Sequence, residues 1–191
     1  MSRIFVTSDT HFGHANIIRY ANRPFRTWSD MGESMIERWN NRVAIDDVVY
    51  FLGDFAMGPG ATLEYILNVL RRLNGSKIGI LGNHDQPSKY SMGLKAAITD
   101  EIFNFEVINE QIHEIRRDGR AFVMCHYPMV DWNGKYHGAI HLHGHIHTQY
   151  TAKAAYDMKE AGRYDIGVDM YGGPVQITSD LRYLNSPEGW V

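Results

Sequence analysis

Three short apolar runs in the first half of the chain each end in a turn that holds an acidic or amide side chain. The runs span residues 4–6, 48–52 and 77–81, and the polar residues that follow them include Asp9, Asp54 and Asn83. Runs of this length predict buried strands. Helical periodicity separates them, and an alternation of strand and helix is typical of a layered α/β protein, whose ligand crevice lies outside the carboxyl ends of the strands.

The helices expected between these strands span residues 15–20, 31–43 and 61–73. For the second of them, Asp30 followed three residues later by Glu33 resembles a capping box. Asn74-Gly75 is expected to end the third helix.

The second half of the chain has a different pattern. Segments 105–116 and 120–125 flank Asp118-Gly119, which predicts a hairpin of antiparallel strands, and residues 139–142 and 164–168 predict two more strands. Two sheets packed face to face with helices outside would accommodate all of these elements. The expected class is therefore mixed α/β, in one domain over residues 1–191.

Composition limits the classes of partner. No run approaches the ~20 apolar residues of a membrane span, and the first apolar run is too short for a secretory signal. Cys125 is the only cysteine, which favours a reducing compartment, and we expect a cytoplasmic protein without a membrane partner. A net charge of −3 disfavours a broad surface for long nucleic acid. The oligomeric state stays open.

Ten histidines are many for 191 residues, and several lie beside turns. Together with the acidic residues they form five segments with ligand side chains: 9–11, 53–54, 82–85, 126 and 144–147. Oxygen and nitrogen donors without thiolate suit divalent Mn, Fe, Zn or Ni, and we expect Mn to support activity in vitro. Two neighbouring ions need a shared carboxylate to offset their repulsion, and Asp54 is the candidate bridge.

These segments resemble the motifs of the calcineurin-like metallophosphoesterases, which are D-x-H, G-D, G-N-H-D, an isolated H and G-H-x-H in this order. The first motif extends over residues 8–14 as in short bacterial and phage-type members. The resemblance implies a four-layer α/β/β/α sandwich of two mixed sheets flanked by helices. It implies one ion on Asp9, His11, Asp54 and His147, and a second ion on Asp54, Asn83, His126 and His145.

The resemblance also implies a hydrolase in which a hydroxide between two cations attacks phosphorus in line. His84 is expected to protonate the leaving alkoxide, with Asp85 orienting it, and a diester such as a cyclic nucleotide is the favoured small-molecule substrate. A phosphomonoesterase and a nuclease acting on nucleic-acid ends are the alternatives. A non-catalytic module of the same fold is disfavoured, because every motif position is filled.

The expected substrate contacts are His14, Asn83 and Arg23. His14 follows Phe12-Gly13 and is expected at the start of a helix, near its positive end, although a surface histidine is the plainer alternative. Arg23 is expected at a phosphate-binding edge with Arg26. Three aromatic residues after His126 are candidates to stack on a nucleobase. They are Tyr127, Trp132 and Tyr136. Asp165 and Asp169 either support the site or lie on a solvent-facing strand.

Overall fold

The structure is a computed structural model that describes residues 2–86, 105–108, 110–147, 162–178 and 189–190. Its first sheet has the strand order β4-β3-β2-β1-β9. The strands β1 to β4 are parallel, and β9 is antiparallel to β1, so this sheet is mixed. Their bounds are β1 Ile4–Thr7, β2 Val48–Phe51, β3 Ser76–Ile80, β4 Phe105–Ile108 and β9 Val175–Gln176.

The second sheet has the order β5-β6-β7-β8 and is also mixed, since β5 is antiparallel to β6 whereas β6, β7 and β8 are parallel. Asp118 and Gly119, both with positive φ, form the expected turn between β5 and β6. Its strands are β5 Ile112–Arg117, β6 Arg120–Cys125, β7 Ile140–His143 and β8 Arg163–Asp165.

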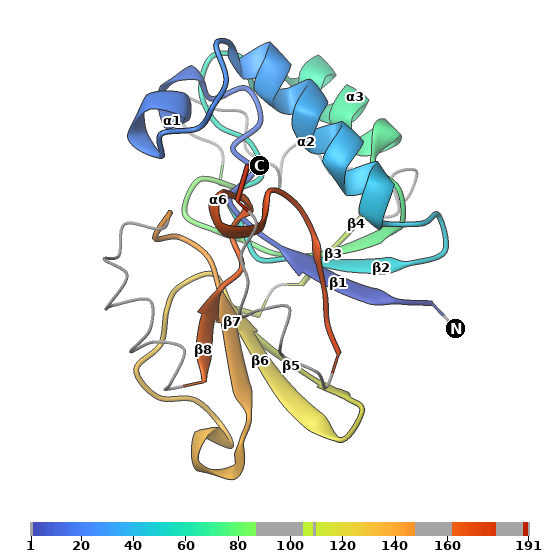
Figure 1. Cartoon of the computed structure of the whole chain (residues 1–191), viewed down its shortest axis with the longest axis vertical. Coiled ribbons are helices and arrows are strands. Elements are labelled where there is room, and N and C mark those ends of the chain that lie inside the picture. Colours follow the sequence, from blue (N-terminus) through green and yellow to red (C-terminus); the bar gives the residue numbers. More distant parts are fainter. Residues whose placement is uncertain (1, 87–104, 109, 148–161, 179–188, 191) are drawn as a thin grey trace.

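Helices α2 and α3 cover one face of the first sheet, and the second sheet lies on its opposite side (Figure 1). The described part of the chain thus has two mixed sheets with flanking helices, which confirms the predicted sandwich. The helical elements are α1 Ala15–Tyr20, α2 Trp28–Arg42, α3 Leu63–Arg72, the 3-10 turn η2 Lys135–His137 and α6 Val168–Tyr171.

Alternation along β1 explains the layering. Phe5 belongs to the hydrophobic cluster under the helices, where it joins Trp39 of α2, whereas its neighbour Val6 belongs to the cluster between the sheets with Phe122 of β6. Successive side chains of a strand point to opposite faces. Strand β1 therefore contributes to both layers of core, and so does β2, with Phe51 under the helices and Tyr50 between the sheets.

Parallel strands bring the predicted site residues to one edge of the sandwich. The strands β1, β2 and β3 end at Thr7, Phe51 and Ile80, and β6 and β7 end at Cys125 and His143. The ligand-bearing loops follow these five positions. This arrangement is the crevice outside the carboxyl ends that the alternation of elements predicts.

Three predicted elements differ from the structure by more than two residues. Helix α2 begins at Trp28 rather than at residue 31, because the Thr27 side chain accepts a hydrogen bond from the Asp30 backbone N–H at 3.0 Å and caps the helix three residues earlier. The segment 105–116 contains two strands, because β4 joins the first sheet beside β3. In the segment 164–168 the strand ends at Asp165, whose Oδ1 accepts from the Gly167 N–H at 2.9 Å, and α6 follows.

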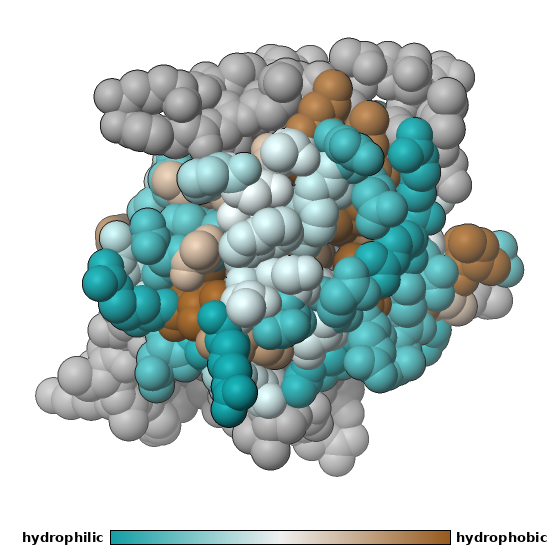
Figure 2. Space-filling model, turned by 90° about the horizontal axis from the view of Figure 1, so that it is seen from above, coloured by the Kyte–Doolittle hydropathy of each residue, from teal (hydrophilic) through white to brown (hydrophobic). Residues whose placement is uncertain are grey.

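The face of the molecule seen in Figure 2 is largely hydrophilic, with the hydrophobic residues in small separate groups. No helix in the described ranges is long and apolar enough to cross a membrane.

The packing between the sheets makes a prediction about stability. Phe122 is 0% exposed and lies in the cluster between the sheets. We expect Phe122→Ala to lower the free energy of unfolding by about 3–5 kcal/mol, because it removes a buried ring and leaves a cavity. Urea denaturation followed by circular dichroism measures this change. Tyr136→Ala is the matched control, since Tyr136 is 85% exposed, and a similar loss in both variants would contradict the assignment of Phe122 to the core.

Candidate metal centre

The loops at the carboxyl ends of the strands bring the predicted ligand residues into two groups. Asp9, His11 and His147 form the first group, and Asp54, His126 and His145 form the second. Within each group, one ligand atom from each residue lies within 4.8 Å of the others. Hereafter they are called the Asp9 group and the Asp54 group.

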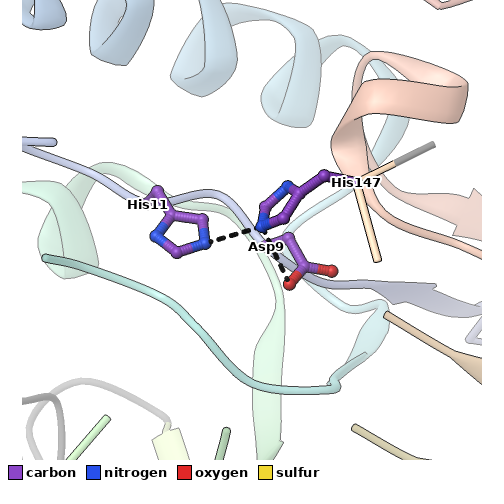
Figure 3. Close-up of side chains that lie close together, drawn as sticks. All are labelled: Asp9, His11 and His147. Carbon is purple, nitrogen blue, oxygen red and sulfur yellow. Dashed lines mark hydrogen bonds and ion pairs between the residues drawn. The ribbon is translucent and has the colours of Figure 1, made fainter. Parts of the chain in front are cut away.

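In the Asp9 group the three side chains point toward a common position (Figure 3). Nε2 of His147 lies 3.1 Å from Nε2 of His11 and 3.9 Å from Oδ1 of Asp9. His11 and Asp9 are buried, and His147 is half-buried. A carboxylate oxygen and two imidazole nitrogens that converge in this way form a suitable donor set for a divalent cation.

Asp54 belongs to the second group but also lies close to the first. Its Oδ2 is 3.6 Å from Nε2 of His11 and 3.6 Å from Nε2 of His126, and the carboxylate is almost fully buried. Asn83 lies on the side of the second group, where its Oδ1 is 3.0 Å from Nε2 of His126. This geometry is the one that a carboxylate shared by two cations requires.

Hydrogen bonds on the outer side of two of the rings leave their Nε2 atoms facing the centre. Nδ1 of His126 donates to the Leu52 carbonyl at 2.7 Å, and Nδ1 of His147 donates to Asp169 Oδ2 at 2.9 Å. A histidine that donates its other N–H in this way presents a lone pair to a metal.

The backbone at these positions is strained. Five of the seven residues other than glycine with positive φ in the described chain belong to the two groups: Asp9, His11, Asp54, His145 and His147. The left-handed region is unfavourable for residues with a Cβ, and such outliers cluster at functional sites. The strain is therefore a second, independent indication that the loops are shaped for a ligand.

Two glycines permit the loops to approach each other. A Cβ on Gly82 would overlap Asp54 and lie 2.9 Å from the His126 ring, and a Cβ on Gly144 would overlap Asp9 and Ser8. Only glycine fits where a backbone passes so close to a carboxylate. The glycines that precede the ligand residues in the sequence thus have a steric function.

The pKa values of the buried ligand residues show how the centre behaves without a cation. Burial, reinforced by the nearby charge of Asp54, raises the pKa of Asp9 to about 7 although His147 and hydrogen bonds oppose the shift. Burial and the neighbouring cationic groups hold the pKa of His11 well below its usual range. Burial alone would lower the pKa of His147, but the hydrogen bond to Asp169 and the charges of Asp9 and Asp169 raise it. A pair of divalent cations would stabilise the charged carboxylates and the neutral rings, so the residues fit these ions.

His84 lies at the mouth of the centre. Its ring is partly exposed and its Nε2 is 4.0 Å from Oδ2 of Asp54, while its backbone N–H donates to Asp54 Oδ1 at 2.9 Å. His14 lies beside it, at the N-cap of α1, with its ring centroid 5.4 Å from that of His11. Burial and the adjacent His84 lower the pKa of His14 to about 4, so its ring is neutral at physiological pH.

Asp85 has a different role from the one expected. Its carboxylate accepts backbone N–H groups of Asp54 at 2.7 Å, Phe55 at 2.8 Å and Gly82 at 2.7 Å, and it is 0% exposed. Both oxygens are engaged by the backbone, so Asp85 positions the loops of Asp54 and Asn83 and does not orient the His84 ring.

Arg23 also differs from the prediction. It was expected at an exposed phosphate-binding edge, but its side chain is 0% exposed and its N–H groups have partners within the chain. These partners are the Asp9 and Thr10 carbonyls, Met31 Sδ and both oxygens of Asp169. The buried guanidinium has no free donor for a substrate.

The remaining predicted residues divide into those that border the metal centre and those that only stabilise the fold. Asp169 lies on α6 and supports His147, whereas Asp165 caps a turn of the backbone. Trp132 is buried with its Nε1 donating to the Ala139 carbonyl, so it cannot stack on a ligand. Tyr127 is 40% exposed and lies edge-on against the rings of His126 and His145. Cys125 is buried beside His126.

The fold and the two ligand groups define a class of metal-dependent hydrolase with a dinuclear centre. The chain belongs to the calcineurin-like phosphoesterase family, whose family model matches residues 2–149. Members of this family depend on two metal ions, and membership indicates a phosphoester hydrolase.

Relatives include short archaeal and phage proteins. An uncharacterised protein of Methanocaldococcus jannaschii is 34% identical over 150 residues, which are 78% of this chain and 72% of the relative. Gene 66 protein of Mycobacterium phage D29 is 30% identical over 207 aligned positions, with 98% of each chain covered. The structure of a protein of unknown function from Aquifex aeolicus has the same fold, with a TM-score of 0.67 and 22% identity over 92% of this chain and 96% of that one.

The charges of the centre predict how pH affects metal binding. The pKa of Asp9 in the folded apoprotein is about 7, above its ordinary value of 3.8. The apoprotein therefore loses stability as pH rises from about 4 to about 7, because the folded state holds a proton that the unfolded state releases. A cation displaces that proton and the one that His147 retains, so the stabilisation by Mn²⁺ should increase between about pH 5.5 and about pH 8.

Thermal denaturation of metal-free and Mn²⁺-loaded protein across this pH range measures both trends. In Asp9→Asn the decline of the apoprotein should become smaller, since the titrating carboxylate is gone. Stabilisation by Mn²⁺ that is constant across the range would contradict the assignment of Asp9 as a ligand.

Proposed function

We propose that this chain hydrolyses phosphodiesters, with cyclic nucleotides or other nucleotide-derived diesters as its substrates. The observation that supports this most directly is the position of His84, half-exposed beside Asp54 at the mouth of a centre with two ligand groups. The proposed ligands are Asp9, His11, Asp54 and His147 for one ion, and Asp54, Asn83, His126 and His145 for the other. When bound, a pair of divalent ions, with Mn²⁺ the proposed choice in vitro, would activate water and polarise the phosphoryl oxygens.

His84 is the proposed general acid. Its ring is close to the centre yet is not a member of either ligand group, so it is free to donate a proton to the departing alkoxide. An alkoxide is a poor leaving group, and the alkoxide that departs from a phosphodiester is stabilised by protonation. This need favours diesters over activated monoesters.

His14 and Asn83 are the proposed substrate contacts from the chain. The neutral His14 ring lies between His11 and Tyr20, where it can donate one N–H to a phosphoryl oxygen. Asn83 has an amide N–H₂ beside its oxygen, which can serve the same purpose while the oxygen faces His126.

Tyr127 supports the nucleotide character of the substrate. Its ring centroid is 4.7 Å from that of His145 and 4.9 Å from that of His126, so one partly exposed aromatic face borders the Asp54 group. Any of the nucleobases can stack on such a face, because stacking does not depend on the type of base. We also propose a reducing compartment, the cytoplasm, since the single cysteine is buried and unpaired.

The substrate class is tested by a panel of esters after reconstitution with each of Mn, Fe, Zn and Ni. We expect turnover of cyclic nucleotides and of bis-p-nitrophenyl phosphate to exceed turnover of phosphomonoesters. An oligonucleotide, assayed at two salt concentrations, tests the nuclease alternative. A strongly salt-sensitive preference for the oligonucleotide would support a nuclease instead, and protein that holds two ions but is inert on every ester would overturn the proposal.

The role of His84 is tested by His84→Ala. Turnover of a diester with an alkyl leaving group should fall by about 10²-fold or more, because such a group needs a proton, while p-nitrophenolate leaves with less help. Metal content by inductively coupled plasma analysis should not change. His137→Ala is the matched control, since His137 is exposed in η2. Loss of metal without loss of turnover, or equal effects on both leaving groups, would refute the proposed role.

A further inference from the structure

We infer that Arg23 is a positioning residue for one of the two metal sites and not for the other. Its buried guanidinium donates to the Asp9 carbonyl directly, to the Thr10 carbonyl next to His11, and to Asp169, which accepts a hydrogen bond from His147. Within the described part of the chain it makes no hydrogen bond or ion pair with Asp54, His126 or His145. The inference rests on the proposed function only in taking two divalent ions as the ligands.

The first link is to the loop that holds Asp9 and His11. Nη2 of Arg23 donates to the Asp9 carbonyl at 2.7 Å, and Nη1 donates to the Thr10 carbonyl at 2.9 Å. Asp9 and His11 both have left-handed backbone, with φ of 58° and 50°. Such a conformation persists only where the surroundings determine it, and the two bonds from Arg23 fix the orientation of the peptides between these residues.

The second link reaches His147 from the other side. Nε and Nη2 of Arg23 donate to the two oxygens of Asp169 at 2.7 and 2.9 Å, which is the bidentate geometry of a strong ion pair. Oδ2 of Asp169 in turn accepts the Nδ1–H of His147 at 2.9 Å. Arg23 therefore fixes the carboxylate that determines the tautomer and the direction of the His147 ring.

Trp190 closes this network on its outer side. Its Nε1 donates to Asp169 Oδ1 at 3.3 Å, and its ring centroid is 5.4 Å from Cζ of Arg23. Phe25, two residues after Arg23, lies edge-on against the same ring. The C end in Figure 1 lies beside α6, the helix that contains Asp169. Cover by aromatic rings excludes water, and ion pairs and charge-assisted hydrogen bonds are stronger in such surroundings.

The Asp54 group has a separate organiser. Asp85 accepts the backbone N–H groups of Asp54 and Gly82, and so fixes the loops that precede and hold Asp54 and Asn83. No hydrogen bond in the described residues joins Asp85 to Arg23 or Asp169. Of the ligand loops, Arg23 thus bonds only to that of Asp9 and His11, and it bonds to the partner of His147, whereas Asp85 bonds to the loop of the shared Asp54, and this separation makes the effect of Arg23 selective.

The test is a calorimetric titration of metal-free protein with Mn²⁺, comparing wild type with Arg23→Lys. Lysine keeps the charge but cannot reach both carbonyls and both oxygens of Asp169 at once. We expect one site to lose about 10- to 100-fold in affinity, as is common when a ligand loses its supporting partner, and the other to change less than about twofold.

Ligand variants identify the weakened site. His126→Ala removes a residue of the Asp54 group, and His147→Ala removes one of the Asp9 group. Adding Arg23→Lys should weaken the ion that remains in His126→Ala and should not affect the ion that remains in His147→Ala. The exposed Arg26 lies three residues further along the same loop, so Arg26→Lys is the matched control and should leave both affinities unchanged.

Two further variants keep the test decisive if Arg23→Lys does not fold, as judged by circular dichroism. Asp169→Asn has the same shape as the wild-type side chain and should weaken the same site as Arg23→Lys, whereas Asp85→Asn should weaken both sites, because it disturbs the loop of the shared Asp54. In Arg23→Lys or Asp169→Asn, equal losses at both sites, or no loss at either, would overturn the inference. Because the titration does not involve hydrolysis, protein that binds two ions but cleaves no ester would refute the proposed function and leave this inference intact.

Discussion

The whole site depends on the burial of two carboxylates, Asp9 and Asp54, among imidazole rings at the edge of the sandwich. Charges of one sign are costly in such surroundings, and the raised pKa of Asp9 reflects that cost directly. Divalent cations remove the conflict by pairing with both carboxylates and with the lone pairs of the rings. The same residues that would destabilise the metal-free centre therefore give it its affinity, and folding of these loops and metal binding are coupled.

Strain and close approach are the structural consequences of that requirement. The donors come from five loops of two sheets, and bringing them within a few ångströms of one another leaves no room for ordinary backbone. Left-handed conformation at Asp9 and Asp54, and glycine at Gly82 and Gly144, are the means by which the chain achieves the convergence. Such local costs are tolerated where the surroundings hold them in place. Here the regular strands before each loop supply the rigid frame.

The sequence predicts the convergence of the candidate ligand side chains well, because the segments that hold them follow apolar runs and parallel strands bring their carboxyl ends to one edge. It predicts Arg23 and Asp85 poorly, since their partners are determined by tertiary packing. Arg23 contacts Asp169, 146 residues away, and Asp85 contacts the backbone of Asp54, 31 residues away. Local pattern has no access to such pairs, and a loop arginine beside Pro24 is more often exposed than buried. The predicted boundaries of α2 and of the strand over residues 164–168 were wrong for a different reason, because Thr27 and Asp165 make local hydrogen bonds that compete with the expected ones.

Asp85 and the network of Arg23 connect different parts of the fold. Asp85 connects only loops of the first sheet, whereas the network of Arg23, Asp169 and His147 connects the end of β1 with a loop that follows β7 and with α6. The Asp9 group therefore spans the two sheets through an ion pair, and the Asp54 group spans them through His126 and its bond to the Leu52 carbonyl. Because both groups join the sheets, any change in the packing between Val6 and Phe122 alters the distances between ligands. The core between the sheets therefore helps to determine the geometry of the site, and one of its residues, Leu52, accepts the hydrogen bond of His126 directly.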